Sequence, residues 1–143
     1  MNARQYLGQL EALDSKIYAD VELLKEKKIR ITGGGAIRYD KDRVQTSLTD
    51  SKLERDVCEV VAFEEKVNER IKQYDQAKEK IIKQIKDLNV ATYIDILFRV
   101  YVQYKTLKQT SNEMNKSYKY VRNKHDEALS EFEKMHQPLE YLS

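Results

Sequence analysis

The chain has 143 residues, of which 35% are charged, and it contains one Pro, four Gly and no Trp. That composition is typical of long amphipathic helices with solvated outer faces. The formal net charge is only +2, which excludes a polycation, so any contact with nucleic acid has to come from a local basic patch. Neither a secretory leader nor a long apolar run is visible, so we expect a cytoplasmic protein without a membrane span.

The single cysteine, Cys58, excludes an internal disulfide. It lies inside a stretch of periodic apolar residues. This position predicts a small buried thiol and argues against a redox or metal-binding role.

A first helix is predicted for residues 2 to about 30. Its apolar residues follow each other at steps of three and four, which places them on one stripe of a helix. They are Tyr6, Leu7, Leu10, Leu13, Ile17, Val21 and Leu24. Three consecutive glycines after Thr32 end this helix, and the polar segment from Thr32 to Thr49 is predicted to be a mobile loop. No Gly-Lys-Ser/Thr follows the glycines, so a phosphate-binding loop is not expected.

A second, longer helix is predicted for residues 51–88, with Asp50 as its N-cap and with Ser51 and Glu54 at the spacing of a capping box. Its apolar residues alternate steps of three and four, which is typical of the seam of a coiled coil. They are Leu53, Val57, Val60, Val67, Ile71, Tyr74, Ile81, Ile85 and Leu88. The first helix is expected to fold back along this seam as an antiparallel hairpin.

This hairpin is expected to leave part of the longer helix uncovered, because the first helix is shorter. The apolar arc is also locally wider than one partner helix needs. Self-association into a homodimer covers the excess; the alternative is that the C-terminal part of the chain packs there. The residues predicted to mediate oligomerisation are Val57, Val60, Val61, Phe63, Val67 and Ile71.

The last third of the chain is predicted to form short helices over residues 91–136, after a break at Asn89-Val90 and before a tail at 137–143. The first of them carries its apolar residues at helical spacing. They are Ile94, Leu97, Val100, Tyr101 and Tyr104.

A second and a third helix are predicted to follow, capped by Thr106 and Ser117. Asn115 suits the turn between them, because Asn tolerates a left-handed backbone. Helix, three- to four-residue turn, helix is the layout of a helix–turn–helix unit. The residues expected to face inward are Leu107, Thr110, Ser111, Met114, Val121, His125, Ala128, Leu129, Phe132 and Met135.

Charge is segregated along this predicted unit. From Lys105 to Lys124 there are five Lys and one Arg against one Glu, a balance of 6 − 1 = +5. From His125 to Ser143 there are five acids against one Lys, a balance of 1 − 5 = −4. The basic half contains the turn and the first half of the third helix, the part that enters the major groove in helix–turn–helix proteins. The segregation therefore favours DNA as a ligand.

Several residues of this unit fall in the register of a known family without a gap over 24 residues: Thr106-Leu107, Met114-Asn115, Ser117, Val121-Arg122-Asn123 and Ala128-Leu129. They resemble region 4 of sigma-70-type factors. Further shared residues are Met1–Leu7, Arg43–Ser47, Tyr104-Lys105, Glu113-Met114-Asn115, Ser117-Tyr118, His125, Ala128-Leu129 and Phe132-Glu133. With these, nearly the whole chain is similar to sigma-like transcriptional regulators of phages and prophages of Gram-positive bacteria, the late-gene activators of the RinA/ArpU type.

Three positions depart from the pattern of that family. Thr110, Ser111 and Lys124 stand where the family usually has apolar or small residues. A buried hydroxyl without a partner costs about 1–3 kcal/mol, although Thr and Ser can bond to the carbonyl four residues back. Lys124 can extend toward a phosphate.

The resemblance and the charge pattern together indicate which residues face DNA. Arg and Asn read base edges, whereas Tyr and Lys more often hold phosphate; the alternative is that these are ordinary solvated residues of a helix. The predicted DNA-binding residues are Lys105, Thr106, Lys108, Ser117, Tyr118, Lys119, Tyr120, Arg122, Asn123 and Lys124.

No catalytic residues, metal site or cofactor are expected. His125 and His136 have no Cys or clustered carboxylate at ligand spacing, and His125 is expected to be a core or capping residue. Two functions remain. The first is a DNA-binding transcriptional regulator of a phage or mobile genetic element, dimerising through its N-terminal coiled coil. The second is a protein-interaction module with a degenerate helix–turn–helix, which modulates a phage transcription activator or RNA polymerase.

Overall fold

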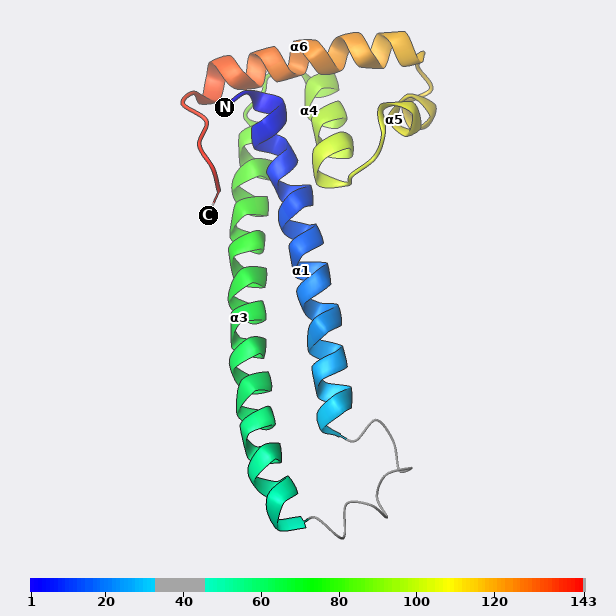
Figure 1. Ribbon diagram of the computed structural model, residues 1–143. Helices are drawn as coiled ribbons and strands as arrows, with labels where there is room; N and C mark the ends of the chain where they lie inside the picture. Colours follow the sequence, from blue (N-terminus) through cyan, green and yellow to red (C-terminus); the bar gives the residue numbers. More distant parts are fainter. Residues whose placement is uncertain (33–45, 143) are drawn as a thin grey trace. The chain divides into compact units, whose positions relative to one another are not determined.

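The computed structural model describes residues 1–32 and 46–142, with the backbone alone for residues 46–51. The regular structure of these residues is helical, so the fold is all-α, as the periodicity predicts (Figure 1). The elements in chain order are α1 (Ala3–Ile31), α3 (Thr46–Lys86), α4 (Ala91–Leu97), a π-helical turn η3 (Phe98–Val102), α5 (Leu107–Met114) and α6 (Tyr118–His136). None of these helices is both long and apolar enough to span a bilayer.

The ends of the two long helices agree only in part with the prediction. Helix α1 ends one residue before Thr32, whose hydroxyl donates to the Lys28 carbonyl (3.1 Å). Helix α3 begins at Thr46, so Asp50 lies inside the helix and the predicted N-cap is wrong. No Gly or Pro stands between Thr46 and Asp50 to stop the helix. Of the predicted mobile loop at 32–49, residues 33–45 lie outside the described residues, whereas residues 46–49 belong to α3, so the predicted end of the loop is wrong.

The chain divides into two compact units that cut across both long helices. Unit 1 consists of residues 1–14 and 73–143, and unit 2 consists of residues 15–72. These boundaries differ from the predicted division at residues 88–91. The reason is that the first turns of α1 and the last turns of α3 share a core with the C-terminal helices. Periodicity within one helix does not reveal such a partner.

The core of unit 1 is built from residues far apart in the sequence. Leu7 and Leu10 of α1, Ile81 and Ile85 of α3, and Phe132 of α6 are completely buried. The rings of Tyr6 and Phe132 lie 5.9 Å apart, between the first turns of α1 and the last turns of α6. Figure 1 shows these turns of α1 beside the last turns of α3, with α6 next to both. Because several helices pack together here, each helix buries apolar residues on more than one of its sides.

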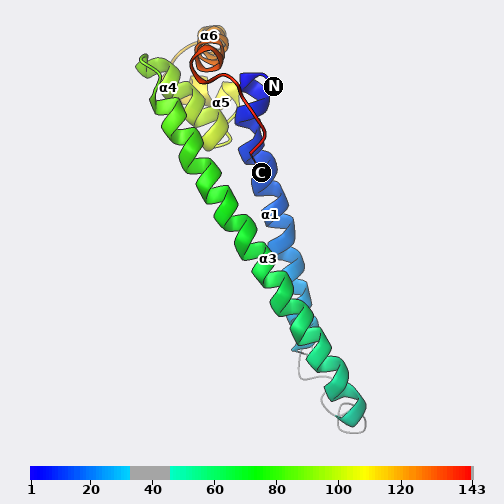
Figure 2. The ribbon, with the colours of Figure 1, turned by 90° about the vertical axis from the view of Figure 1, so that its left-hand side faces the viewer.

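Polar bonds tie the same elements together inside unit 1. The Tyr6 hydroxyl donates to Gln84 Oε1 (2.6 Å), and His136 Nε2 lies 2.9 Å from the Gln84 carbonyl oxygen. The C-terminal tail runs back along α1, where the Leu142 N–H donates to Gln9 Oε1 at 2.8 Å (Figure 2). Met135, predicted to face inward, is exposed instead, because α6 buries only the stripe that faces its neighbours.

The predicted single helix from Ile94 to Tyr104 is in fact two elements. Helix α4 passes into the π-helical turn η3, and Tyr104 lies beyond both with a left-handed backbone (φ 59°). A bulky residue rarely adopts this conformation. Two contacts hold it: the Tyr104 hydroxyl lies 2.7 Å from the Tyr74 hydroxyl and 3.4 Å from the Leu10 carbonyl oxygen. Tertiary contacts have therefore overridden the local helical pattern.

Unit 2 consists of the remaining parts of α1 and α3. Leu24, Val60 and Val67 form its buried stripe. The two segments run antiparallel, since Lys28 pairs with Glu64 (3.4 Å) while Asp20, earlier in α1, pairs with Arg70, later in α3.

Several residues predicted to be buried are exposed in unit 2. Leu53 and Val57 of the predicted seam are 39% and 41% exposed. Cys58 is also exposed, so the predicted buried thiol is wrong. Cys58 stands two positions before buried Val60, which is about 200° around the helix and thus on the opposite face.

Candidate functional site

Helices α5 and α6 and the turn between them carry most of the predicted binding residues. Thr106 caps α5 with a reciprocal capping box: the Gln109 N–H donates to Thr106 Oγ1 (3.1 Å) and the Thr106 N–H donates to Gln109 Oε1 (2.9 Å). Ser117 caps α6 by accepting from the Tyr120 N–H (3.1 Å). Asn115 has the left-handed backbone that ends α5 (φ 56°). The two predicted caps and the predicted turn are confirmed.

The polar residues Thr110 and Ser111 are buried without being left unsatisfied. The Thr110 hydroxyl donates to the Thr106 carbonyl (2.9 Å), and the Ser111 hydroxyl donates to the Lys108 carbonyl (2.7 Å). Each bond stays within its own helix, so it satisfies the hydroxyl without a partner from elsewhere. The cost expected for a polar group in this core is thereby avoided.

His125 is a buried residue of the core, as expected, and its ring stacks on that of Tyr101 in η3. Its Nε2 is 2.8 Å from the Tyr101 hydroxyl, and its Nδ1 is 3.5 Å from Asp126 Oδ1. Asp126 in turn lies 3.7 Å from Arg4 of α1. Burial, reinforced by the charge of Arg4, lowers the pKa of His125, and burial raises the pKa of Tyr101 to about 12. Both groups are therefore neutral at physiological pH.

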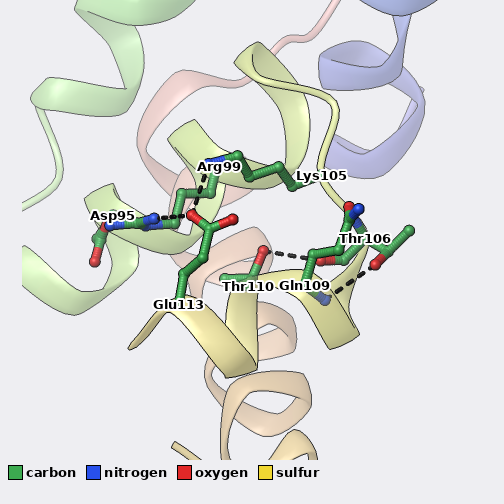
Figure 3. A network of polar contacts seen from close by, with 7 residues as sticks. All are labelled: Asp95, Arg99, Lys105, Thr106, Gln109, Thr110 and Glu113. Carbon is green, nitrogen blue, oxygen red and sulfur yellow. Dashed lines mark hydrogen bonds and ion pairs between the residues drawn. The ribbon is translucent and has the colours of Figure 1, made fainter. Parts of the chain in front are cut away.

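A network of charges joins η3 to α5 around one carboxylate. Lys105 Nζ lies 2.6 Å from Glu113 Oε1, and Arg99 Nη1 pairs with the same oxygen (Figure 3). Arg99 Nε also lies 2.7 Å from Asp95 Oδ1. The Lys105 ammonium, together with Arg99, lowers the pKa of Glu113. Two cations and two carboxylates thus balance each other at this point.

A second pairing holds Lys124 on the side of α6 that faces α4. Lys124 Nζ lies 3.1 Å from Glu127 Oε2, which also accepts a hydrogen bond from the Tyr93 hydroxyl (2.9 Å). The bond from Tyr93, with that from Lys124, lowers the pKa of Glu127. The ring of Tyr120 lies under both Lys116 (5.7 Å) and Lys124 (5.8 Å), at cation–π distance.

The predicted DNA-binding residues therefore fall into two groups. Lys105 and Lys124 are half-buried and engaged by internal carboxylates. The other predicted residues are exposed, and within the described residues Lys119 and Arg122 form no ion pair. These exposed residues are Thr106, Lys108, Ser117, Tyr118, Lys119, Tyr120, Arg122 and Asn123.

The residues predicted to mediate oligomerisation are also divided by the structure. Val60 and Val67 are buried between α1 and α3 and are not available to another chain while this pair persists. Phe63 and Ile71 are half-buried, and Phe63 lies under Lys27 (5.4 Å to the ring centroid). Only Val57 and Val61 are exposed, at 41% and 50%.

Some residues of the charge network were missed by the sequence analysis. Arg99, Asp95, Glu127 and Tyr93 were not singled out, although the spacing of Asp95 and Arg99 allows an ion pair along a helix. Glu113 carried a signal too, as the only acid in the basic segment from Lys105 to Lys124. Among residues 1–32 and 52–142, no three His, Cys, Asp or Glu side chains come together as a metal site would require.

Comparison with known proteins gives no match to a family model, to a curated protein or to a solved structure. The resemblance to sigma-like regulators therefore remains a prediction.

Proposed function

We propose that the chain is a DNA-binding transcriptional regulator of a phage or mobile genetic element, and not an enzyme. In this proposal α5 and α6 form a helix–turn–helix of the sigma region 4 type, and the first half of α6 contacts the major groove. The observation that carries the proposal is the pairing of charges. The internal carboxylates engage Lys105 and Lys124, whereas Lys119 and Arg122 on the outer face of α6 are left to meet an external anion.

Roles for the individual residues follow from their chemistry. Lys119 is a flexible point charge suited to a phosphate, whereas Arg122 and Asn123 can form paired hydrogen bonds with base edges. All three are exposed. Val121, one position before Arg122, and His125, three positions after it, are buried and hold α6 in place.

The test measures binding to upstream DNA of the genetic element that encodes the chain, over a range of salt. Lys119→Ala is expected to weaken binding to every sequence and to flatten the dependence of log affinity on log salt by about one unit. Arg122→Ala and Asn123→Ala are expected to cost about 1–3 kcal/mol, mainly on the specific site. Lys134→Ala, at an exposed lysine in the acidic half of α6, is the matched control. It should leave the affinity for DNA and its dependence on salt unchanged.

Dimerisation belongs to the same proposal. One small helix–turn–helix buries little surface, and two linked copies bind two half-sites. The exposed side chains of Leu53, Val57 and Val61 in unit 2 support a second copy as the partner of α3.

The same exposed residues favour the second candidate function, a module that binds a phage activator or RNA polymerase. Binding to DNA and binding to a protein partner distinguish the two functions. If the parent chain binds no DNA even at low salt, the regulator is excluded. If Val57→Ser with Val61→Ser then abolishes binding of the protein partner, the interaction module is supported.

A further inference from the structure

We propose that Arg99 and Lys105 form a second anion-binding site, which Glu113 occupies in the free chain and for which a phosphate of the DNA backbone has to compete in the complex. This inference rests on the proposed function. It goes beyond it by giving Glu113 a role as an internal competitor for DNA, and by adding Arg99 to the surface that meets the ligand.

The geometry of the site is that of a bound anion. The Arg99 guanidinium and the Lys105 ammonium come from η3 and from the connection before α5, and they converge on the same oxygen of Glu113 (Figure 3). Arg and Lys are the two side chains that proteins use most to hold phosphate oxygens. The carboxylate therefore stands where a phosphate oxygen fits.

An external anion can reach this site without unfolding the chain. The side chains of Arg99, Lys105 and Glu113 are 28%, 30% and 37% exposed. Glu113 contributes a flexible side chain near the end of α5, while Thr110 and Ser111 hold the buried side of that helix through bonds within it. Moving the Glu113 carboxylate into water leaves those bonds in place.

The balance of charge indicates how many positive charges become available to DNA when a phosphate replaces Glu113. Arg99 and Lys105 carry two positive charges, and Asp95 and Glu113 carry two negative ones. Asp95 remains on Arg99 Nε when Glu113 leaves, so one positive charge becomes available, which matches one phosphate contact. While Glu113 stays, this charge contributes nothing to the release of counterions from DNA.

The consequence is that Glu113 lowers the affinity for DNA of any sequence. Phosphate contacts carry no sequence information. When they contribute less to the affinity, the choice between DNA sequences depends more on the residues that read bases. The single acid of the basic segment thus limits binding to the wrong DNA.

The experiment compares Glu113→Gln with the parent on a short duplex of scrambled sequence. Gln keeps an oxygen acceptor for Lys105 and Arg99 but removes the charge, so the melting temperature is expected to stay close to that of the parent. The plot of log affinity against log salt is expected to steepen by about one unit. The gain in affinity at 50 mM salt should then shrink about threefold by 200 mM.

Two controls separate the site from a general effect of charge. Glu140→Gln changes the net charge by the same amount in the exposed part of the tail, and it is expected to give no comparable gain. Lys105→Ala should remove the gain, so that the double variant Glu113→Gln with Lys105→Ala binds the scrambled duplex no more tightly than Lys105→Ala alone. Equal gains for Glu113→Gln and Glu140→Gln, or a gain that survives Lys105→Ala, would overturn the inference.

A measurement without DNA distinguishes failure of this inference from failure of the proposed function. Inorganic phosphate, compared with chloride at equal ionic strength, is expected to raise the melting temperature of Glu113→Gln more than that of the parent. If neither chain binds DNA but phosphate has this effect, the anion site stands and the regulator proposal fails. If phosphate acts equally on both chains and the duplex shows no gain, the anion site is wrong.

Discussion

Units 1 and 2 contain parts of the same two long helices, yet they bury their apolar residues very differently. The largest side chains that are fully buried in the described chain, among them Phe132, Leu7 and Ile81, lie in unit 1. Of the unit 2 residues whose burial the structure describes, only Leu24, Val60 and Val67 are buried, and apolar residues such as Leu53, Val57 and Val61 remain in water. A pair of helices covers one stripe on each, whereas a third and a fourth helix close the other sides. The number of neighbours, more than the sequence of a helix, decides how much of it is buried.

The largest effect is expected from removing the aromatic ring at the centre of unit 1. Phe132→Ala should lower the free energy of unfolding by about 3–5 kcal/mol, because it leaves a cavity in a fully packed core. Phe63→Ala in half-buried surroundings of unit 2 is the matched variant and should cost clearly less. Chemical denaturation followed by circular dichroism measures both. Equal losses would mean that the two units are packed equally well.

A matched pair of leucines on α1 tests the boundary between the units. Leu7→Ala should cost about 2–5 kcal/mol, because Leu7 is completely buried in unit 1, and it should destabilise α6 with it. Leu23→Ala, on the same helix but 47% exposed, should change the free energy of unfolding by less than about 0.5 kcal/mol. Hydrogen exchange of α6 reports the coupling. If Leu7→Ala left exchange in α6 unchanged, the first turns of α1 would not belong to that core.

Lowering the pH should reduce the free energy of unfolding because of His125 in unit 1. Burial lowers its pKa in the folded chain below the ordinary value of 6.5, so the folded state favours the neutral ring. The stabilisation from the neutral ring is fully present above pH 6.5. As the pH falls from 6.5 toward the folded pKa, the unfolded chain binds a proton that the folded chain does not, so the free energy of unfolding decreases. Denaturation at several pH values between 7.5 and 5 measures the loss. His125→Gln should be less sensitive to pH over this range; an identical pH dependence would contradict the assignment.

The smallest effect on folding is expected on the exposed side of unit 2. Val57→Ser together with Val61→Ser should change the free energy of unfolding of the monomer by no more than about 0.5 kcal/mol per site. The proposed dimer has twice the chain mass of 16.9 kDa, and the double variant should reduce the mass measured by light scattering to that of one chain. A parent chain that is monomeric at every concentration would exclude this role for Val57 and Val61.

The sequence by itself determined where the long helices lie and how α5 and α6 are capped, because these features depend on residues close together in the chain. Spacing of apolar residues predicts α1, α3 and α6. The side chains of Thr106 and Ser117 cap the first turns of α5 and α6, and the left-handed backbone of Asn115 ends α5. The tertiary structure decided which helices share a core. Tyr104 adopts its left-handed backbone within contacts to Tyr74 and Leu10, each at least 30 positions away in the sequence.

The same distinction applies to the candidate site. The basic segment is visible in the sequence, but a count of charges treats Lys105 and Lys119 alike. Only the folded chain brings Arg99, Lys105 and Glu113 to one point while it leaves Lys119 in water, because charges pair by distance in space and not by distance along the chain.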